Sequence, residues 1–365
     1  MHSGGAERVA ATLCNAWARR GDEVTLVATY SGRGECHYPL ADGVRLVYLA
    51  DLAGGGRGAV LGYGARLLAL RRLLRRQGPD VVVSFLTNVN INAILATRGL
   101  GIPLIVCERT DPLASADHST LTRLACRLLY PLADIVTVQT ESVADRLRAY
   151  IPKARRIDVV PNPVSDALLD VRRAECRRPR RRLLAIGRLS PEKQFDQLID
   201  VYAGLAGAHP DVDLWIWGEG PLRRELEGQV DRLGLRGRVF LPGRTESPWA
   251  EMARGEIVVL TSAYEGFPNV MLEAMAIGLP CVAYDCPSGP RELSRDGQVA
   301  RLVPLNDRNG LRNAIVALLD DAVLRRQLGA AAAASARRHY RLDAIVARWD
   351  RLILAARDGR GFACA

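Results

Sequence analysis

Residues 257–280 read IVVLTSAYEGFPNVMLEAMAIGLP, and this stretch decides the fold. It opens on the apolar run Ile257–Leu260, which is typical of a strand covered on both faces. A loop containing Gly266 follows, and a helix is predicted to begin near Asn269, which can cap it. Gly278 ends that helix, with a proline just beyond. A buried strand, a loop and a helix in this order indicate one unit of a parallel α/β sheet.

The same alternation of short apolar runs and helical stretches extends over the whole chain. The runs predicted as strands are 24–27, 44–49, 81–85, 104–106, 135–138, 158–160, 183–186, 214–217, 239–241, 257–260 and 281–284. Helical patterns lie between them, for example at 7–19, 66–76 and 195–208. Two successive series of this kind predict two doubly wound, Rossmann-like α/β domains.

The boundary between the two domains is marked in the sequence. Pro161-Asn162-Pro163 can continue neither a strand nor a helix. Seven arginines then crowd residues 172–182, where like charges repel one another and stay solvated. The expected parts are a first domain over 1–165, a linker over 166–182, a second domain over 183–342 and a C-terminal helix within 343–365 that packs back on the first domain.

The first residues enter a helix at once, through Gly4 and Gly5. Glycines at a strand-to-helix turn normally follow a strand, and the first strand of a doubly wound sheet is usually central. We therefore expect a strand and a turn, roughly 6 to 12 residues, ahead of Met1.

The composition indicates a globular protein with a polyanionic partner. Of the 365 residues, 48% are hydrophobic and 25% charged, which excludes general disorder. No apolar run is long enough to span a bilayer, and eight scattered cysteines without a Cys-x-x-Cys pair indicate reduced, cytoplasmic thiols. The net charge of +10 fits nucleic acid, an anionic membrane or substrate phosphates. Aromatic residues, at 5%, do not interleave with the arginines, which argues against single-stranded nucleic acid, while the charge does not choose among the other partners. The final expectation includes no nucleic-acid partner.

Polar residues at the carboxyl ends of strands in the second domain form one candidate site. The helix beginning near Asn269 offers free N–H groups to an anion, and Glu265 and Glu273 can address hydroxyl groups on either side of it. Arg188 and Lys193 lie five residues apart after the first strand of that domain and can neutralise a diphosphate. The turns that close the next two strands, Gly218-Glu219-Gly220-Pro221 and Pro242-Gly243-Arg244-Thr245, belong to the same crevice.

Taken in order, these motifs resemble glycosyltransferase family 4 over nearly the whole chain. The resemblance rests on Gly-Gly-Ala-Glu-Arg-Val at 4–9, Gly-Arg-Leu-x-x-Glu-Lys at 187–193, Gly-x-Gly-Pro at 218–221 and the Glu-x7-Glu pair at 265 and 273. That family has the GT-B fold, in which two Rossmann-like domains face one another across an active-site cleft. Segments 107–112 and 284–292 are similar to the branch that acts in lipopolysaccharide, exopolysaccharide and lipid-linked oligosaccharide assembly.

The resemblance implies a role for each matched residue. Arg188 and Lys193 would hold the donor diphosphate and stabilise its charge as it leaves. Glu273 would bind the donor ribose, Glu265 would contact sugar hydroxyls, and the backbone around Arg244 would meet the nucleobase. The other expected donor contacts are Gly4, Gly5, Gly187, Gly218, Gly266, Phe267 and Asn269. The family transfers sugars with retention of anomeric configuration, by a same-face mechanism without a clear protein nucleophile.

One position departs from the family pattern. Many members carry a histidine near the reacting sugar, after the fourth or fifth strand of the first domain. Here Glu108 and Arg109 occupy the nearest equivalent positions, with His118 further along. The candidate catalytic residues are therefore Glu265, Arg188, Lys193, Arg109 and His118.

No cofactor and no metal ion is expected. Asp211-Val212-Asp213 imitates the Asp-x-Asp of metal-dependent transferases, but it precedes its strand, at the wrong edge of the sheet, and is interpreted as a turn. The basic, amphipathic helix at 66–76 has two interpretations. It packs on the core with a solvated opposite face, or it docks on an anionic membrane.

The expected function is a retaining transfer of sugar from a nucleotide-sugar donor, with UDP as the expected nucleotide, to a hydroxyl of a glycan or lipid-linked acceptor. The expected location is the cytoplasm, peripheral on the inner face of the membrane. A nucleotide-sugar epimerase of the same fold and a non-catalytic glycan- or nucleic-acid-binding protein are the alternatives. A dinucleotide oxidoreductase is disfavoured because Gly218-Glu219-Gly220 lacks the third glycine of its fingerprint.

Overall fold

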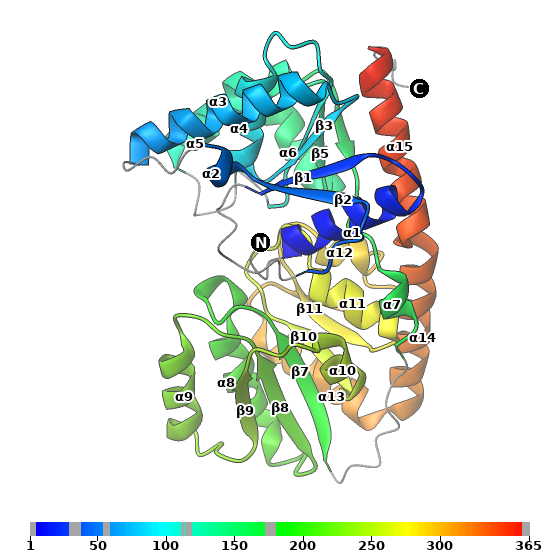
Figure 1. Ribbon diagram of the computed structural model, residues 1–365. Coiled ribbons are helices and arrows are strands. Elements are labelled where there is room, and N and C mark those ends of the chain that lie inside the picture. The colour runs from blue at the N-terminus through cyan, green and yellow to red at the C-terminus, as the bar shows by residue number, and fades with distance from the viewer. Residues whose placement is uncertain are drawn as a thin grey trace. The chain divides into compact units, whose positions relative to one another are not determined.

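The computed structural model describes residues 5–28, 38–53, 59–110, 113, 119–171 and 180–359, without the side chains of 59–63. The chain divides into two compact units, residues 1–163 with 343–365, and residues 164–342 (Figure 1). Strands and helices alternate in each unit, and every strand pairing in the described part of the chain is parallel. This is the doubly wound α/β architecture that the sequence predicts.

The first unit contains two parallel sheets where the sequence predicts one. Its elements are α1 (Gly5–Arg19), β1 (Val24–Ala28), β2 (Val44–Tyr48), α2 (Leu49–Leu52), α3 (Ala59–Gln77), β3 (Val82–Phe85), α4 (Thr87–Thr97), β4 (Leu104–Cys107), α5 (Thr120–Leu129), η1 (Tyr130–Leu132), β5 (Ile135–Val138), α6 (Glu141–Tyr150), β6 (Ile157–Val159) and α15 (Leu342–Asp358). Strands β1 and β2 form one sheet, and β3-β4-β5-β6 form the other, with no joining strand among the described residues. The strand expected ahead of Met1 stays a prediction.

The C-terminal helix α15 packs in the first unit. Trp349 on this helix is 1% exposed. Its ring lies edge-on to Trp17 of α1, with 6.2 Å between the ring centroids, and at the same centroid distance from Phe85 of β3. Residues from the two ends of the sequence therefore share one core.

The second unit is built on one six-stranded sheet. Its elements are α7 (Asp166–Leu169), β7 (Arg181–Ile186), η2 (Pro191–Lys193), α8 (Phe195–Ala206), β8 (Val212–Trp217), α9 (Arg223–Arg232), β9 (Val239–Gly243), α10 (Pro248–Ala253), β10 (Ile257–Leu260), α11 (Asn269–Ile277), β11 (Cys281–Asp285), α12 (Pro290–Leu293), β12 (Arg301–Pro304), α13 (Arg308–Asp320) and α14 (Ala322–His339). The strand order is β12-β11-β10-β7-β8-β9, so β7 lies between β10 and β8.

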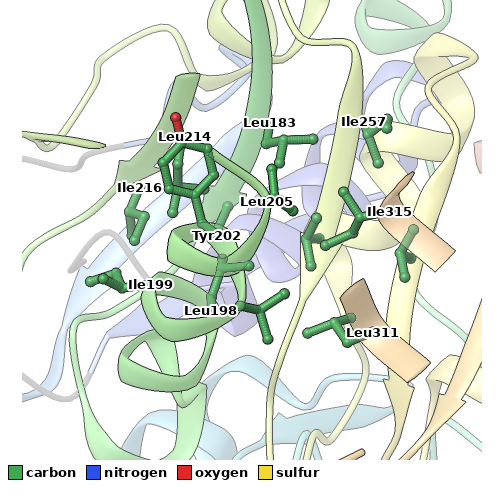
Figure 2. Packing of buried hydrophobic residues seen from close by; sticks show 14 of the residues in the cluster. Leu183, Leu198, Ile199, Tyr202, Leu205, Leu214, Ile216, Ile257, Leu311 and Ile315 are labelled. Carbon is green, nitrogen blue, oxygen red and sulfur yellow. The ribbon is translucent and has the colours of Figure 1, made fainter. Parts of the chain in front are cut away.

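Helices cover both faces of this sheet. Leu183 and Leu184 are neighbours in β7, yet they belong to different buried clusters, because successive side chains of a strand point to opposite faces. Leu183 packs with α8 and α13, through residues such as Leu198 and Ile315 (Figure 2). Leu184 lies in the cluster formed with α10, α11 and α14. This double burial explains why the strands read as continuous apolar runs.

The predicted linker, 166–182, differs from the structure at both ends. Residues 166–169 form α7, which Ser165 caps by accepting from the Leu168 N–H, and buried Leu168 packs in the core of the second unit. Arg181 and Arg182 already belong to β7. Arg181 pairs with Asp211 at 2.7 Å, and Arg182 with Glu251 at 3.4 Å, so carboxylates neutralise charges that we expected to be solvated. Residues 172–179 lie outside the described residues.

One further expectation is corrected, and one strand was missed. Asn269 is the first residue of α11 and does not cap it, because Pro268 occupies the N-cap position. Strand β12 was not predicted, since it is an edge strand with two exposed residues among four. In α3, the Arg71 guanidinium donates to the carbonyls of Ala96 and Arg98 at 2.9 and 2.7 Å, so this one arginine is used by the fold. Membrane docking of the helix at 66–76 stays a prediction. No described helix is both long and apolar enough to cross a bilayer.

Replacing the buried indole of Trp349 tests the place of α15 in the first unit. Trp349→Ala should lower the free energy of unfolding by about 3–5 kcal/mol, because it leaves a cavity beside Trp17 and Phe85. Leu354→Ala on the same helix removes a side chain that is 55% exposed, and should change stability by no more than about 0.5 kcal/mol. Urea unfolding followed by tryptophan fluorescence measures both. Equal effects of the two substitutions would show that α15 is not part of this core.

Candidate functional site

The loops that follow β7, β8 and β9 run side by side at the carboxyl edge of the second unit's sheet. The ladder of backbone hydrogen bonds continues past the strand ends, where the Gly187 N–H donates to the Trp217 carbonyl at 2.9 Å. In the same way the Gly218 N–H donates to the Gly243 carbonyl at 2.8 Å. Three of the predicted motifs are therefore held in one fixed backbone arrangement.

Two glycines make this approach possible. A Cβ on Gly218 would lie 1.8 Å from the Gly187 carbonyl oxygen, and Gly218 adopts a φ of +146°, which other residues rarely take. A Cβ on Gly220 would lie 2.3 Å from the Leu189 carbonyl oxygen. The Gly-x-Gly-Pro motif is therefore required for close packing of two loops, whatever else it contacts.

Lys193 and Glu265 meet at this edge of the sheet. The Lys193 Nζ lies 2.6 Å from the Glu265 Oε1, and the two side chains are 23% and 12% exposed. Ser262 also donates to the Glu265 Oε1, at 2.7 Å. The family resemblance implies separate roles for these residues, on a diphosphate and on a sugar, and the structure brings them into contact. Each keeps capacity for a ligand, because an ammonium has three donors and a carboxylate several acceptor positions.

The backbone around Lys193 is tied to the loop after β10. Thr261 donates its hydroxyl to the Lys193 carbonyl at 2.7 Å, and the Ala263 N–H donates to the Glu192 carbonyl at 2.8 Å. Gln194 then adopts the left-handed conformation, with a φ of 48°, between η2 and α8. A non-glycine residue in this region is uncommon, so the surrounding contacts impose this turn. The turn fixes the point from which the lysine side chain leaves the backbone.

The loop carrying Glu265 is supported from the strand on its other side. Ser288, after β11, donates its hydroxyl to the carbonyls of Glu265 and Gly266. The next residue, Gly289, has a φ of +101°, and a Cβ there would lie 2.3 Å from the Pro268 ring. Segment 284–292, which resembles the polysaccharide branch of the family, therefore positions the loop that leads into α11.

Glu273 is buried on α11, with 7% of its surface exposed. Its Oε2 accepts a hydrogen bond from the Trp249 indole N–H of α10, at 3.2 Å. A buried carboxylate that is hydrogen-bonded by an indole has a fixed orientation. The structure therefore supports a positioned Glu273 rather than a solvated one on a helix surface.

Arg188 and Arg244 extend into solvent. Both side chains are exposed. Arg188 leaves the backbone one residue after Gly187, and Arg244 one residue after Gly243, so both lie on the loops joined by the extended ladder. Exposed guanidinium groups at this edge are available to an anionic ligand. Gly187 directly follows β7, Gly266 and the buried Phe267 lie on the loop after β10, and Asn269 begins α11.

Cys286 lies close to the ion pair but is not a reactive thiol. Burial raises the pKa of its thiol to about 12, with nearby Glu265 adding to the effect and Lys193 opposing it. The group is therefore neutral near pH 7, and the thiolate is the nucleophilic form. The described part of the chain holds no cluster of His, Cys, Asp and Glu suited to a metal ion.

In the first unit, Glu108 belongs to a buried polar network. It accepts from the hydroxyls of Thr87, at 2.8 Å, and of Tyr130, and Asn90 donates to it at 3.5 Å. Glu108 is 2% exposed and Tyr130 0%. Burial, together with the carboxylate, raises the pKa of the Tyr130 phenol well above its usual value. These contacts give Glu108 a structural role.

Arg109, the next residue, contacts Asn162 and Phe85 instead of the polar network around Glu108. Its Nη1 donates to the Asn162 Oδ1 at 2.6 Å, and its guanidinium carbon lies 4.5 Å from the centre of the Phe85 ring. Burial lowers its pKa to about 10, so it still carries its charge near pH 7. The buried Nε and Nη2 have no hydrogen-bond partner among the described residues. Such a group can receive an anion, and its role as a catalytic helper stays a prediction.

Two of the predicted site residues, Gly4 and His118, lie outside the described residues, and Gly5 is the exposed first residue of α1.

Asp213 is the second residue of β8 rather than part of a turn. Arg180 and Arg238 pair with its carboxylate at 2.7 and 3.2 Å, so it serves the fold. The sequence analysis did not identify the residues that support the site through hydrogen bonds, which are Trp249, Thr261, Ser262 and Ser288. Their spacing in the sequence does not indicate which groups they contact.

Two family models match consecutive parts of the chain. One, described as "Glycosyl transferase 4-like domain", matches residues 4–163, and the other, "Glycosyl transferases group 1", matches residues 172–335. Together they span both units. The chain therefore belongs to this glycosyltransferase family, as the motifs indicate, and is an enzyme of the transferase class.

Individual relatives and a solved structure agree with this assignment. The chain is 28% identical over 332 residues to the GalNAc-α-(1→4)-GalNAc-α-(1→3)-diNAcBac-PP-undecaprenol α-1,4-N-acetyl-D-galactosaminyltransferase of Campylobacter jejuni, covering 90% of this chain and 89% of the relative. HepE from Anabaena, crystallised with UDP and glucose, superposes with a TM-score of 0.79 at 20% identity, over 97% of each chain. This likeness confirms the GT-B fold class.

A third relative is matched in part. The exopolysaccharide phosphotransferase SCO2592 of Streptomyces coelicolor is 35% identical over 229 residues. The match takes in 61% of this chain and 23% of that protein. The chain thus spans about a quarter of this relative.

Gly218 tests the packing of the two loops. Gly218→Ala should lower the free energy of unfolding by about 3 kcal/mol or more, because the added Cβ overlaps the Gly187 carbonyl and opposes the positive φ. Gly207→Ala is the matched control, since a Cβ there meets nothing within 4 Å and its φ is −68°. Thermal or urea unfolding compares the two. A Gly218 variant as stable as the control would contradict the close approach.

Proposed function

We propose that this glycosyltransferase moves a sugar from a UDP-sugar donor to a hydroxyl of a glycan or lipid-linked acceptor, with retention of anomeric configuration. One observation carries the proposal. Lys193 and Glu265 are in contact at the carboxyl edge of the sheet, on loops that also carry Arg188 and lead into α11. In an open α/β sheet this edge is where ligands bind.

The chemistry of the site supports a diphosphate donor. Lys193 supplies a point charge, and Arg188 a planar guanidinium that can bind two phosphate oxygens. The first N–H groups of α11 add a partial positive charge. These groups stabilise the negative charge that develops on the diphosphate as the bond to the sugar breaks. Glu273, held by Trp249, would accept hydrogen bonds from the donor ribose.

The choice of UDP and the retaining course rest on the family and on the solved structures. HepE, with the same fold, was crystallised with UDP and glucose. Glu265 is engaged with Lys193 and Ser262, and the Cys286 thiol is neutral, which supports a mechanism without a protein nucleophile. Attack by the acceptor hydroxyl oxygen on the anomeric carbon, on the face from which UDP departs, would retain the configuration, with the hydroxyl proton passing to a phosphate oxygen of the departing UDP. No metal or cofactor is required by this scheme.

The names of the relatives support a glycan or lipid-linked acceptor. The Campylobacter relative is named for an undecaprenol-diphosphate-linked glycan, and the chain carries a net charge of +10, which suits a phosphate-bearing acceptor or an anionic membrane. We place this activity in lipopolysaccharide or other polysaccharide assembly. The enzyme would work in the cytoplasm, peripheral on the inner face of the membrane.

The two lysines of the chain provide a matched test of the diphosphate site. Lys193→Ala should lower kcat/KM for the donor by about 10²- to 10³-fold, because the developing charge loses a partly buried ammonium. Lys153→Ala removes an exposed lysine of the first unit and should leave kcat/KM unchanged. The measurement is UDP release from a donor chosen by a thermal-shift screen of UDP-sugars, where a ligand at 100 times its Kd adds about 2.7 kcal/mol of stability. Full activity of the Lys193 variant would refute the assigned role.

The stereochemistry of the product is a separate test. An α-linked UDP-sugar should give an α-linked glycoside, because the acceptor attacks from the face of the departing diphosphate. The coupling constant of the anomeric proton in the isolated product distinguishes the α from the β linkage. A β-linked product would overturn the retaining mechanism. A free epimerised sugar nucleotide formed without acceptor would instead support the epimerase alternative.

A further inference from the structure

Helix α5 presents a row of leucines to solvent. Leu121, Leu124 and Leu128 are 75%, 48% and 64% exposed. At positions i, i+3 and i+7 they share one face of the helix. Cys126, which is 1% exposed, lies on the opposite face and packs in the core of the first unit. The most apolar stripe of α5 therefore faces away from the core.

This arrangement reverses the usual one. A surface helix normally turns its apolar stripe inward, because removing leucine side chains from water stabilises the fold. Scattered exposed leucines are ordinary, but an aligned row indicates an interaction surface. Leu95 on α4, the helix that packs beside α5, and Leu132, three residues beyond α5, are exposed as well. The apolar surface thus extends past a single helix.

The helices around this row are uniformly basic. Helix α3 packs on α4, and α4 on α5. Residues 59–77, 87–98 and 120–129 contain eight arginines and no acidic residue. Arg71 is used by the fold, but Arg72, Arg75, Arg76, Arg98 and Arg127 are exposed. A leucine row on a helix group without a negative charge is complementary to an apolar partner with an anionic surface.

We propose that the leucine face of α5 docks on an anionic lipid bilayer, with Leu121, Leu124 and Leu128 entering the acyl boundary and arginines of α3, α4 and α5 contacting the headgroups. Leucines supply burial, and arginines near the surface supply attraction to anionic lipids. A second copy of the chain fits less well, because a symmetric pair would bring the same arginine-rich helices, which hold no acidic residue, against one another.

This docking surface is a property separate from the transfer reaction. It rests on the proposed function only because a lipid-linked acceptor would lie in a membrane. Vesicle binding is measured with neither donor nor acceptor present. Failure to bind vesicles and failure to transfer sugar are therefore separate results. The proposed contact is centred on the leucines of α5, and the exposed arginines of the predicted helix at 66–76 contribute to it, while Arg71 is engaged by the fold.

The test is co-flotation of the full chain with vesicles of equal parts phosphatidylcholine and phosphatidylglycerol, and with vesicles of phosphatidylcholine alone. The test variant combines Leu121→Ser, Leu124→Ser and Leu128→Ser. Its matched control combines Leu233→Ser, Leu305→Ser and Leu354→Ser, which are exposed leucines elsewhere in the chain, at 42%, 37% and 55%. The single substitution Leu121→Ser, at the most exposed position, keeps the test valid if the triple variant is poorly folded.

We expect the wild type and the control to float with the anionic vesicles, and the α5 triple variant to lose at least about tenfold in binding. Reversing the charges of Arg72, Arg75 and Arg76 to Glu should weaken binding to the anionic vesicles and leave any binding to neutral vesicles unchanged. Wild-type protein that does not float with the anionic vesicles, or α5 variants that float as well as wild type, would overturn the proposal. A concentration-dependent dimer that the leucine substitutions dissociate would assign the face to a second copy instead.

Discussion

The parallel pairing of β7 between β10 and β8 is the constraint on which the site depends. Because the three strands run in one direction, their carboxyl ends meet at one edge of the sheet. The loops that follow them bear Lys193, Glu265 and the Gly218 turn. Backbone hydrogen bonds continue beyond the strands, and Gly218 lets the neighbouring loops approach without a side chain between them. An acidic and a basic side chain from distant parts of the sequence can then touch.

The supports around the ion pair are mostly neutral. Thr261, Ser262 and Ser288 hold backbone and carboxylate groups through hydroxyls, and Trp249 holds Glu273 through an indole N–H. Neutral donors orient a carboxylate without cancelling its charge, so the groups remain able to bind a ligand. Arginines outside the site are used differently, since Arg180 and Arg238 pair with a buried aspartate of the fold. Arginines at the amino edge of the sheet thus stabilise the fold, whereas Arg188 and Arg244 at the carboxyl edge are exposed and available to a ligand.

The sequence predicted the strands that are buried on both faces, because their composition is unambiguous, and the structure brings two of the predicted site residues, Lys193 and Glu265, into contact. The sequence analysis missed β12, an exposed edge strand, and α7, whose four residues carry no periodic signal. It also could not show that Lys193 and Glu265 are partners, since 72 residues separate them and register decides the contact. The exposed leucines of α5 have helical spacing like core residues, and the packing of the unit alone shows which way they face.

The position of α15 has a consequence for biosynthesis. A ribosome releases the first 163 residues long before it makes residues 343–358, yet Trp349 fills space between Trp17 and Phe85. The unit whose first 163 residues are translated first therefore lacks part of its interior until residues 343–358 have emerged. During that interval the second unit can complete its own sheet, so the order of completion is the reverse of the order of synthesis.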